Sequence, residues 1–255
     1  MRLATFNILH GRSLDDGRVD LDRFAAAVRS LDADVLGLQE VDRDQPRSHG
    51  ADLTAVAAEA MGAVDSRFVA ALSGTPGATW VAATGNEQPG SATYGIALLS
   101  RFPVISWRVL RLAPLRARLP LWSPVTHRPF LARDEPRVGV AAVVDGPRGR
   151  FTVAVTHLSY VPGWNALQLR RLVRGLAGSD EPLVLMGDLN MRPTAAARIS
   201  GLRPLGAALT FPADRPTRQL DHVLARGRLR AVGAASAPAL PLSDHRALVV
   251  PVEPG

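Results

Sequence analysis

Cysteine is absent from this chain of 255 residues. Disulfides and thiolate metal sites are therefore excluded, and a cytoplasmic location is the plain expectation. The chain also lacks a run of about 18 uninterrupted apolar residues, the length that a membrane-spanning helix needs, so we expect no transmembrane segment. The first apolar stretch is short and is interrupted at Asn7, His10 and Arg12, a pattern that is not typical of a signal peptide.

Lysine is absent too, so all 30 basic residues are arginine, and the net charge is +7. Two interpretations stay open. An arginine-rich surface attracts a polyanion such as nucleic acid, a nucleotide or a lipid headgroup. Alternatively, a GC-rich coding bias favours arginine together with the alanine, glycine and proline that are also abundant here. Under either interpretation a guanidinium group can bind phosphate through two parallel hydrogen bonds.

Aromatic residues are scarce, at 5%, whereas hydrophobic residues make up 47% of the chain. Leucine, valine and alanine must therefore fill most of the core. The length and the absence of a composition break predict a single domain over residues 1–255, and we expect a monomer.

Strand patterns alternate with helical patterns, which predicts an α/β fold with much antiparallel pairing. Helices are expected at 21–31, after a capping Asp20, at 53–61, before Gly62, and at 164–176. Strands are expected at 3–9, 34–39, 96–100, 104–112, 138–145, 151–157, 182–187, 223–224 and 248–252. The strands at 96–100 and 104–112 are expected to be adjacent, and 138–145 and 151–157 to form a hairpin. Residues 113–136 contain five prolines and are expected to form a long surface loop.

Polar side chains stand where these apolar strands begin or end, an arrangement that can converge on one rim of stacked sheets, where ligand sites of α/β proteins tend to lie. They are Asn7, Glu40, His157, Asp188, Asn190, Asp221, His222, Asp244 and His245. Taken singly, each has an ordinary interpretation as a turn residue, a helix cap or a surface side chain. The functional prediction depends on all of them occurring in one chain.

Carboxylates, carboxamides and imidazoles without cysteine favour a hard cation, Mg²⁺ or Mn²⁺, over structural zinc. Such a cation neutralises the non-bridging oxygens of a phosphate, a carboxylate orients or deprotonates water, and a histidine hydrogen-bonds to the developing charge. The pattern therefore favours displacement at phosphorus.

Seven segments in this order resemble the endonuclease/exonuclease/phosphatase superfamily, the DNase I-like metal-dependent phosphohydrolases. They are Thr5-Phe6-Asn7, Leu38-Gln39-Glu40-Val41-Asp42, Ala97-Leu98-Leu99-Ser100-Arg101-Phe102-Pro103, Thr156-His157-Leu158, Gly187-Asp188-Leu189-Asn190, Leu220-Asp221-His222-Val223-Leu224 and Ser243-Asp244-His245-Arg246. The resemblance implies a four-layer sandwich in which two packed mixed β-sheets are flanked by helices.

The resemblance also implies roles for individual residues. Glu40 resembles the principal metal ligand, and Asn7 and Asp244 assist at the metal or its waters. His157 resembles the histidine that contacts the scissile phosphate. Asp188 resembles the residue that orients or deprotonates water, and Asn190 resembles the one that positions the phosphate. Asp221 resembles a carboxylate that either orients His157 or joins the metal shell. His245 resembles a second catalytic histidine, held by a neighbouring acid.

Several other positions fit the family pattern less closely. Tyr94 is expected either to offer a hydroxyl to phosphate or simply to pack. Arg137, in preference to Arg133, is expected to reach the phosphate. His10 could border the site, whereas His222 is expected to point away from it.

The sequence thus predicts a hydrolase that uses Mg²⁺ or Mn²⁺ to cleave a phosphodiester or phosphomonoester by in-line attack of water. A nuclease is favoured by the net charge and by a cluster formed by Arg108, Arg111, Arg116 and Arg118. A phospholipid or inositol-phosphate esterase is favoured by four apolar residues in the predicted loop: Leu119, Leu121, Trp122 and Phe130. A non-catalytic protein that binds a phosphorylated ligand is the rival from another class.

Overall fold

The computed structural model describes residues 1–122, 129–178 and 182–254. Its larger sheet has seven strands in the order β14-β15-β1-β2-β5-β3-β4. The strands are β14 (Leu229–Ala231), β15 (Leu248–Pro254), β1 (Arg2–Asn7), β2 (Val35–Arg43), β5 (Thr93–Ser100), β3 (Asp65–Gly74) and β4 (Trp80–Ala82). The sheet is mixed, because β1 pairs parallel with β2 and antiparallel with β15.

The second sheet has six strands in the order β12-β13-β11-β10-β9-β6. They are β12 (Arg203–Pro204), β13 (Asp221–Arg226), β11 (Leu183–Asp188), β10 (Gly149–His157), β9 (Arg137–Gly146) and β6 (Val104–Leu112). This sheet is mixed as well, with β10 parallel to β11 and antiparallel to β9. The predicted hairpin of β9 and β10 is confirmed.

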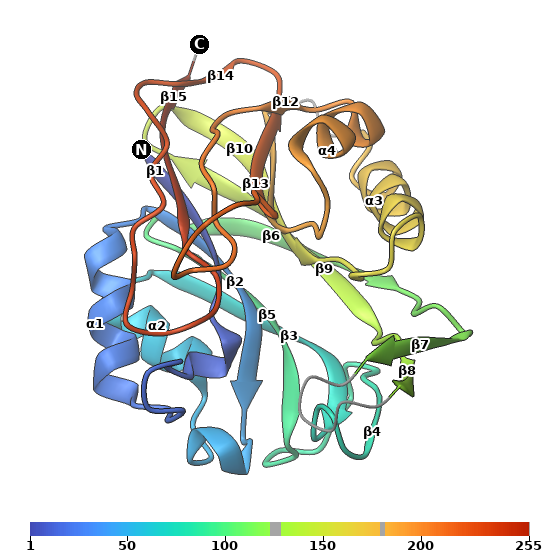
Figure 1. Cartoon of the computed structure of the whole chain (residues 1–255). Coiled ribbons are helices and arrows are strands. Elements are labelled where there is room, and N and C mark those ends of the chain that lie inside the picture. Colours follow the sequence, from blue (N-terminus) through green and yellow to red (C-terminus); the bar gives the residue numbers. More distant parts are fainter. Residues whose placement is uncertain (123–128, 179–181, 255) are drawn as a thin grey trace.

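The two sheets pack face to face through a shared aliphatic core, in which Leu3, Ile96 and Leu98 of one sheet meet Val140 and Val153 of the other. Helices α1 (Leu21–Leu31) and α2 (Leu53–Met61) cover the outer face of the seven-stranded sheet. Helices α3 (Trp164–Gly175) and α4 (Pro193–Ser200) cover the outer face of the other sheet (Figure 1). The predicted four-layer sandwich is confirmed.

Capping residues define the first two helices, and two of them, Asp20 and Gly62, were predicted from the sequence. The Asp20 side chain accepts a hydrogen bond from the backbone N–H of Arg23 at the start of α1. The Asp52 side chain does the same for Thr54 and Ala55 at the start of α2. Gly62 ends α2 in the left-handed conformation, which costs glycine nothing.

Two expectations about the middle of the chain are wrong. The strands at 96–100 and 104–112 are not adjacent, because β5 lies in the seven-stranded sheet and β6 at the edge of the six-stranded one. The turn between them therefore crosses from one layer to the other. Residues 113–136 are not all loop, since β7 (Arg118–Trp122) and β8 (Pro129–Arg133) pair antiparallel as a separate two-stranded sheet. Among the described residues, β7 and β8 pair with each other alone and do not join either large sheet. Their sequences therefore show little of the alternation of apolar and polar residues by which a strand is recognised.

Strand β2 also differs from its expected form, because it continues through Glu40 to Arg43. The pairing with β5 shifts register between Gln39 and Val41, so Glu40 lies at a β-bulge with φ of +59°. A bulge turns the side chain out of the regular alternation of the strand and is common beside functional sites.

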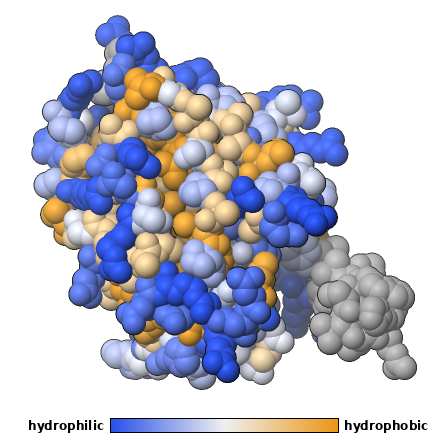
Figure 2. Space-filling model, turned by 60° about the vertical axis from the view of Figure 1, so that its left-hand side comes forward, coloured by the Kyte–Doolittle hydropathy of each residue, from blue (hydrophilic) through white to orange (hydrophobic). Residues whose placement is uncertain are grey.

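Among the described residues, no helix combines the length and the apolar character needed to cross a membrane. Figure 2 shows one face of the molecule, on which hydrophilic residues border a central band of apolar and weakly polar residues.

Candidate active site

Strand register brings three of the predicted site residues into one row across the six-stranded sheet. His157 at the end of β10 stands opposite Asp188 at the end of β11, and Asp188 stands opposite Asp221 at the start of β13. The close approach of β10 and β11 requires glycine at position 187, because a Cβ there would lie 1.9 Å from the Thr156 carbonyl oxygen and φ is +141°. The glycine therefore fixes where the Asp188 carboxylate stands.

Asn7 connects this row to the other sheet. Its Nδ2 donates to Glu40 Oε1 at 3.1 Å and to Asp188 Oδ2 at 3.3 Å. Asn7 is itself held in place, since Ser243 Oγ donates to the Asn7 carbonyl oxygen at 2.6 Å. One carboxamide thus bridges the two carboxylates that the sequence analysis assigned to different tasks, metal binding and water activation.

Asp188 is buried, with 2% of its surface exposed. Burial and the negative charge of Asp221 raise the pKa of Asp188 to about 7, although His245 and the hydrogen bonds from Asn190 and Asn7 act in the opposite direction. The backbone N–H of Asn190 donates to Asp188 Oδ1 at 2.9 Å. A carboxylate with a pKa near neutrality is suited to accept a proton from water.

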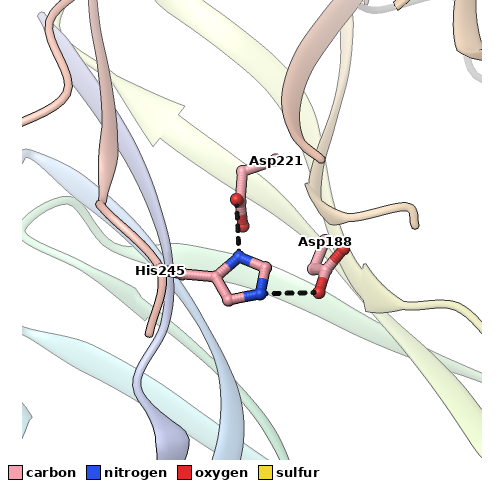
Figure 3. A group of neighbouring side chains, drawn as sticks. All are labelled: Asp188, Asp221 and His245. Carbon is pink, nitrogen blue, oxygen red and sulfur yellow. Dashed lines mark hydrogen bonds and ion pairs between the residues drawn. The ribbon is translucent and has the colours of Figure 1, made fainter. Parts of the chain in front are cut away.

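His245 lies between two carboxylates, as Figure 3 shows. Its Nδ1 is 2.9 Å from Asp221 Oδ2, and its Nε2 is 3.8 Å from Asp188 Oδ2. Burial alone would lower the pKa of His245, but the hydrogen bond to Asp221 and the surrounding carboxylates raise it to about 9. His245 is therefore an imidazolium at neutral pH. Asp221 thus contacts His245, whereas the sequence analysis had it orient His157 or join a metal shell.

His157 has the opposite environment. Arg137 Nη1 lies 3.2 Å from Nδ1 of His157, and an arginine can only donate, so this ring nitrogen is the acceptor. Burial and the charges of Arg137 and His245 hold the pKa of His157 well below its usual value. His157 is therefore neutral and carries its proton on Nε2, which lies 3.5 Å from Asp188 Oδ2.

The two histidines thus differ in charge although both face Asp188. His157 is a neutral donor fixed by a guanidinium, and His245 is a charged donor fixed by a carboxylate. Asn190 completes this part of the site. Its Nδ2 donates to the carbonyl of Leu158 at 3.0 Å and lies 3.4 Å from His157 Nε2.

Glu40 faces a hollow of about 430 Å³ beside this row. Burial and the charge of Asp244 raise the pKa of Glu40, against the hydrogen bond from Asn7. Tyr94, Arg137 and His10 line the same hollow, so the structure brings these three expected residues to the site. His222 points elsewhere, as expected, with its Nε2 2.9 Å from the carbonyl oxygen of Met191.

Sequence reasoning missed Arg47, Glu135 and Tyr160, which also line the hollow. None of them stands at the end of an apolar strand. Arg47 reaches the site from a short 3-10 helix (Pro46–Ser48), and Glu135 and Tyr160 reach it from loops. Glu135 could have been found through its neighbour Arg137, because the two side chains form an ion pair at 3.5 Å.

Two of the four arginines in the predicted cluster bind backbone carbonyl groups. Arg108 Nη1 donates to the carbonyl of Gly175, and Arg111 Nη1 donates to the carbonyls of Ala70 and Ala83. These two guanidinium groups therefore support the fold. The side chains of Leu119, Leu121, Trp122 and Phe130 lie outside the described residues.

The buried acidic groups fit a divalent cation. The charge of Asp244 raises the pKa values of both Glu40 and His245, and the charge of Asp188 also raises that of His245. These three carboxylates therefore lie close together around one charged imidazole, that of His245. Ligand atoms of Asp188, Asp221 and His245 lie within 4.8 Å of one another, so this group could also hold a metal. Asp221 Oδ1 is buried without a hydrogen-bond partner among the described residues. Carboxylate and carboxamide oxygens are ligands that hard cations prefer.

A comparison with curated proteins gave no significant match. Among solved structures, the chain is similar to an endonuclease/exonuclease/phosphatase from Beutenbergia cavernae, with 27% identity, a TM-score of 0.71, and coverage of 100% of this chain and 72% of the other. It is similar in fold to a mannosyl-6-phosphatase from Bacteroides thetaiotaomicron (16% identity, TM-score 0.64, 99% of both chains). It is likewise similar in fold to sphingomyelinase C from Streptomyces griseocarneus (18% identity, TM-score 0.62, 98% of both chains).

The model of the endonuclease/exonuclease/phosphatase family matches residues 4–245, a stretch that includes every predicted site residue from Asn7 to His245. Members of this family are hydrolases that act on phosphoester bonds. The convergent carboxylates, carboxamides and imidazoles described above suit such chemistry. This chain belongs to the endonuclease/exonuclease/phosphatase family.

Proposed function

We propose that this protein hydrolyses a phosphodiester or phosphomonoester with the help of Mg²⁺ or Mn²⁺, by in-line attack of water on phosphorus. The observation that carries the proposal is the position of Asp188 Oδ2, 3.5 Å from His157 Nε2 and 3.8 Å from His245 Nε2. A base and two donors of different charge are thereby brought together, so that a phosphate and its attacking water bound beside them would have all three groups within reach.

Glu40, Asn7 and Asp244 are the residues that would hold the cation. When bound, the cation supplies positive charge to the non-bridging oxygens of the phosphate. Among the described residues, the Glu40 carboxylate accepts its hydrogen bond from Asn7, and burial disfavours its charge. A cation at this position would reverse that penalty.

The protein residues divide the proton transfers among them. Asp188, whose pKa is about 7, accepts the proton of the attacking water. His245 is charged because of Asp221, and it gives its proton to the leaving oxygen as the bond between that oxygen and phosphorus breaks. His157 donates through Nε2 without changing its own charge, and the Asn190 carboxamide beside it positions the phosphate. Water is the nucleophile, so no covalent intermediate with the enzyme is required.

The test is turnover of a generic phosphodiester and a generic phosphomonoester with Mg²⁺, by the wild type and by the Asp188→Ala and His157→Ala variants. We expect both variants to lose at least about 100-fold in kcat, because Asp188→Ala removes the general base and His157→Ala removes a donor to the developing negative charge. Arg148→Met, at a surface position with 67% side-chain exposure, is the control and keeps its activity. Wild-type activity in both site variants would refute the assignment.

The rival hypothesis is a protein that binds a phosphorylated ligand without turnover. Calorimetry with Mg²⁺ and a substrate panel separates the two, since binding without product favours the rival. The panel comprises plasmid DNA, RNA, sphingomyelin, inositol phosphates, sugar phosphates and nucleotides, because relatives of this fold include a mannosyl-6-phosphatase and a sphingomyelinase.

A further inference from the structure

The hollow beside Glu40 is lined by more guanidinium groups than one phosphate requires. Arg47, Arg133 and Arg137 line it, against the carboxylates of Glu40 and Glu135. Glu135 already pairs with Arg137, and the proposed function assigns Glu40 to a cation. Arg47 pairs with Asp42 through two of its three guanidinium nitrogens, so its third nitrogen and the guanidinium group of Arg133 then remain in the hollow without an assigned partner among the described residues.

Arg47 is rigidly held in this hollow. Its Nε and Nη2 donate to the two carboxylate oxygens of Asp42 at 2.8 and 2.7 Å. Asp42 is fully buried and also accepts a hydrogen bond from Ser48 Oγ at 3.1 Å. The guanidinium carbon lies 5.4 Å from the centre of the Tyr94 ring. A guanidinium fixed in this way loses little further entropy when it binds an anion.

The fork to Asp42 leaves one guanidinium nitrogen for a ligand. Among the described residues, Arg47 Nη1 has no hydrogen-bond partner, and the side chain remains 30% exposed at the wall of the hollow. His10 on the same wall carries no charge at neutral pH, so it does not attract an anion away from Arg47. Burial and the charges of Arg47 and Arg12 lower its pKa to about 4, so it is neutral.

Arg47 is separate from the reacting centre. Arg137 contacts His157, so its guanidinium belongs to the scissile phosphate. Tyr94 is buried, and the charges of both Arg137 and Arg47 act on its hydroxyl. Arg137, Tyr94 and Arg47 all line the hollow, which at about 430 Å³ has room for more than one small group.

We propose that Arg47, together with Arg133, binds a second phosphate group of the substrate, so that preferred substrates carry two phosphates. The proposal rests on the proposed function and names its substrate class. Guanidinium groups suit phosphate because their donors match its oxygens in spacing and charge. A nucleotide with two phosphates and an inositol bisphosphate share this chemistry, and the experiment distinguishes them.

The experiment compares kcat/KM for matched substrates with Mg²⁺. One pair is adenosine 3′-monophosphate and adenosine 3′,5′-bisphosphate. The other is inositol 1-phosphate and inositol 1,4-bisphosphate. In the wild type we expect the second phosphate to raise kcat/KM about tenfold in at least one pair, an effect of the size of one charge-assisted hydrogen bond. A preference confined to one pair identifies the molecule that carries the phosphates.

The decisive variant is Arg47→Met, in which the preference should fall to within about twofold. The matched control, Arg148→Met, removes an arginine far from the hollow and should retain the preference. Because the readout is a ratio between two substrates, partial unfolding cannot produce the expected result. The double variant Asp42→Asn/Arg47→Met leaves no buried carboxylate unpaired and serves if the single variant does not fold.

Equal kcat/KM within each pair for the wild type would overturn the inference and leave the proposed function intact. An unchanged preference in Arg47→Met would also overturn it. If the wild type hydrolyses none of the four compounds nor the generic esters, the proposed function itself has failed.

Discussion

The two ends of the sandwich both contain a hollow, and the two hollows differ in chemistry. One, of about 430 Å³, lies beside Glu40 where β1, β10 and β11 end. The other, of about 340 Å³, lies where these strands begin and is lined by residues such as Met1, Phe151 and Leu229. At the first end, charged groups are buried and contact one another. At the second, Arg148 and Arg150 have side chains that are 67% and 60% exposed.

The difference shows which feature of a hollow indicates catalysis. Burying a charge is costly unless other groups stabilise it. Asp188, Asp221 and His245 are all buried, and the charged imidazole and the two carboxylates stabilise one another through contacts of 2.9 to 3.8 Å. The exposed arginines at the far end have no such cost, and their hollow is mostly apolar. A buried polar network whose members shift one another's pKa values is thus the stronger sign of an active site.

The largest effect should follow from His245→Gln. The variant keeps a hydrogen-bonding side chain but removes the imidazolium that Asp221 stabilises. We expect kcat to fall by about 10² to 10⁴, the range for loss of a general acid. Steady-state rates on the best substrate of the panel measure it. The matched control is His222→Gln, since His222 is buried but bonds to Met191 instead. If both variants lost activity equally, a general packing defect would explain the result.

The next effect concerns the stability of chelator-treated protein. The pKa of Asp188 is about 7 in the folded protein and 3.8 in the absence of the fold. Between these values the folded state binds more protons, so the free energy of unfolding falls as pH rises. The Asp188→Asn variant has no carboxyl group at this position, so its free energy of unfolding does not fall with pH for this reason. The variant should therefore gain stability over the wild type between about pH 4 and pH 7, by at most about 1.4 kcal/mol per pH unit.

Urea denaturation at several pH values, with a chelator present, measures that difference. Adding Mg²⁺ at pH 8 should then stabilise the wild type more than Asp188→Asn, because the cation offsets the buried negative charge. A variant that is no more stable than the wild type at pH 8 would show that the Asp188 charge is already satisfied by protein groups.

A smaller effect is expected from Glu40→Gln. The carboxamide keeps the shape and the contact with Asn7 but removes the charge that would bind the cation. The Mg²⁺ concentration for half-maximal activity should rise at least about tenfold, while kcat at saturating Mg²⁺ changes less. Asp145→Asn, on the β9–β10 hairpin at the far end, is the control. An unchanged Mg²⁺ requirement would exclude Glu40 from the metal site.

Much of this site could be predicted from the sequence, because strands impose order on it. Asn7, His157 and Asp188 each end an apolar run, and parallel pairing places the ends of such runs side by side. The positions of residues that are fixed by strand register can therefore be predicted from the sequence. The alternation of strands and helices predicted an α/β fold with much antiparallel pairing, whereas the two-sheet sandwich was implied by the resemblance to the family.

Other features depended on contacts between layers and could not be predicted in this way. The partner of Asp221 is His245, from a loop 24 residues later, and no local pattern encodes that choice. The crossing from β5 to β6 could not be predicted for the same reason. A three-residue turn has the same sequence pattern whether it joins two strands of one sheet or strands of two different sheets. Arg47 was missed because its role derives from Asp42 and the shape of the hollow.

The smallest effect should come from the far end of the molecule. Arg148→Met removes an exposed guanidinium that lies 3.9 Å from Glu253, and such a surface ion pair contributes about 0–1 kcal/mol. We expect stability to change by less than about 0.5 kcal/mol, since a surface substitution seldom does more. Activity should stay at the wild-type level. Thermal denaturation and steady-state kinetics check both points. A tenfold reduction in turnover would correspond to a loss of about 1.4 kcal/mol in transition-state stabilisation. If Arg148→Met produced such a reduction, the apolar hollow would also serve the reaction. The contrast between the two ends would then fail, because buried charge would not be what distinguishes an active site.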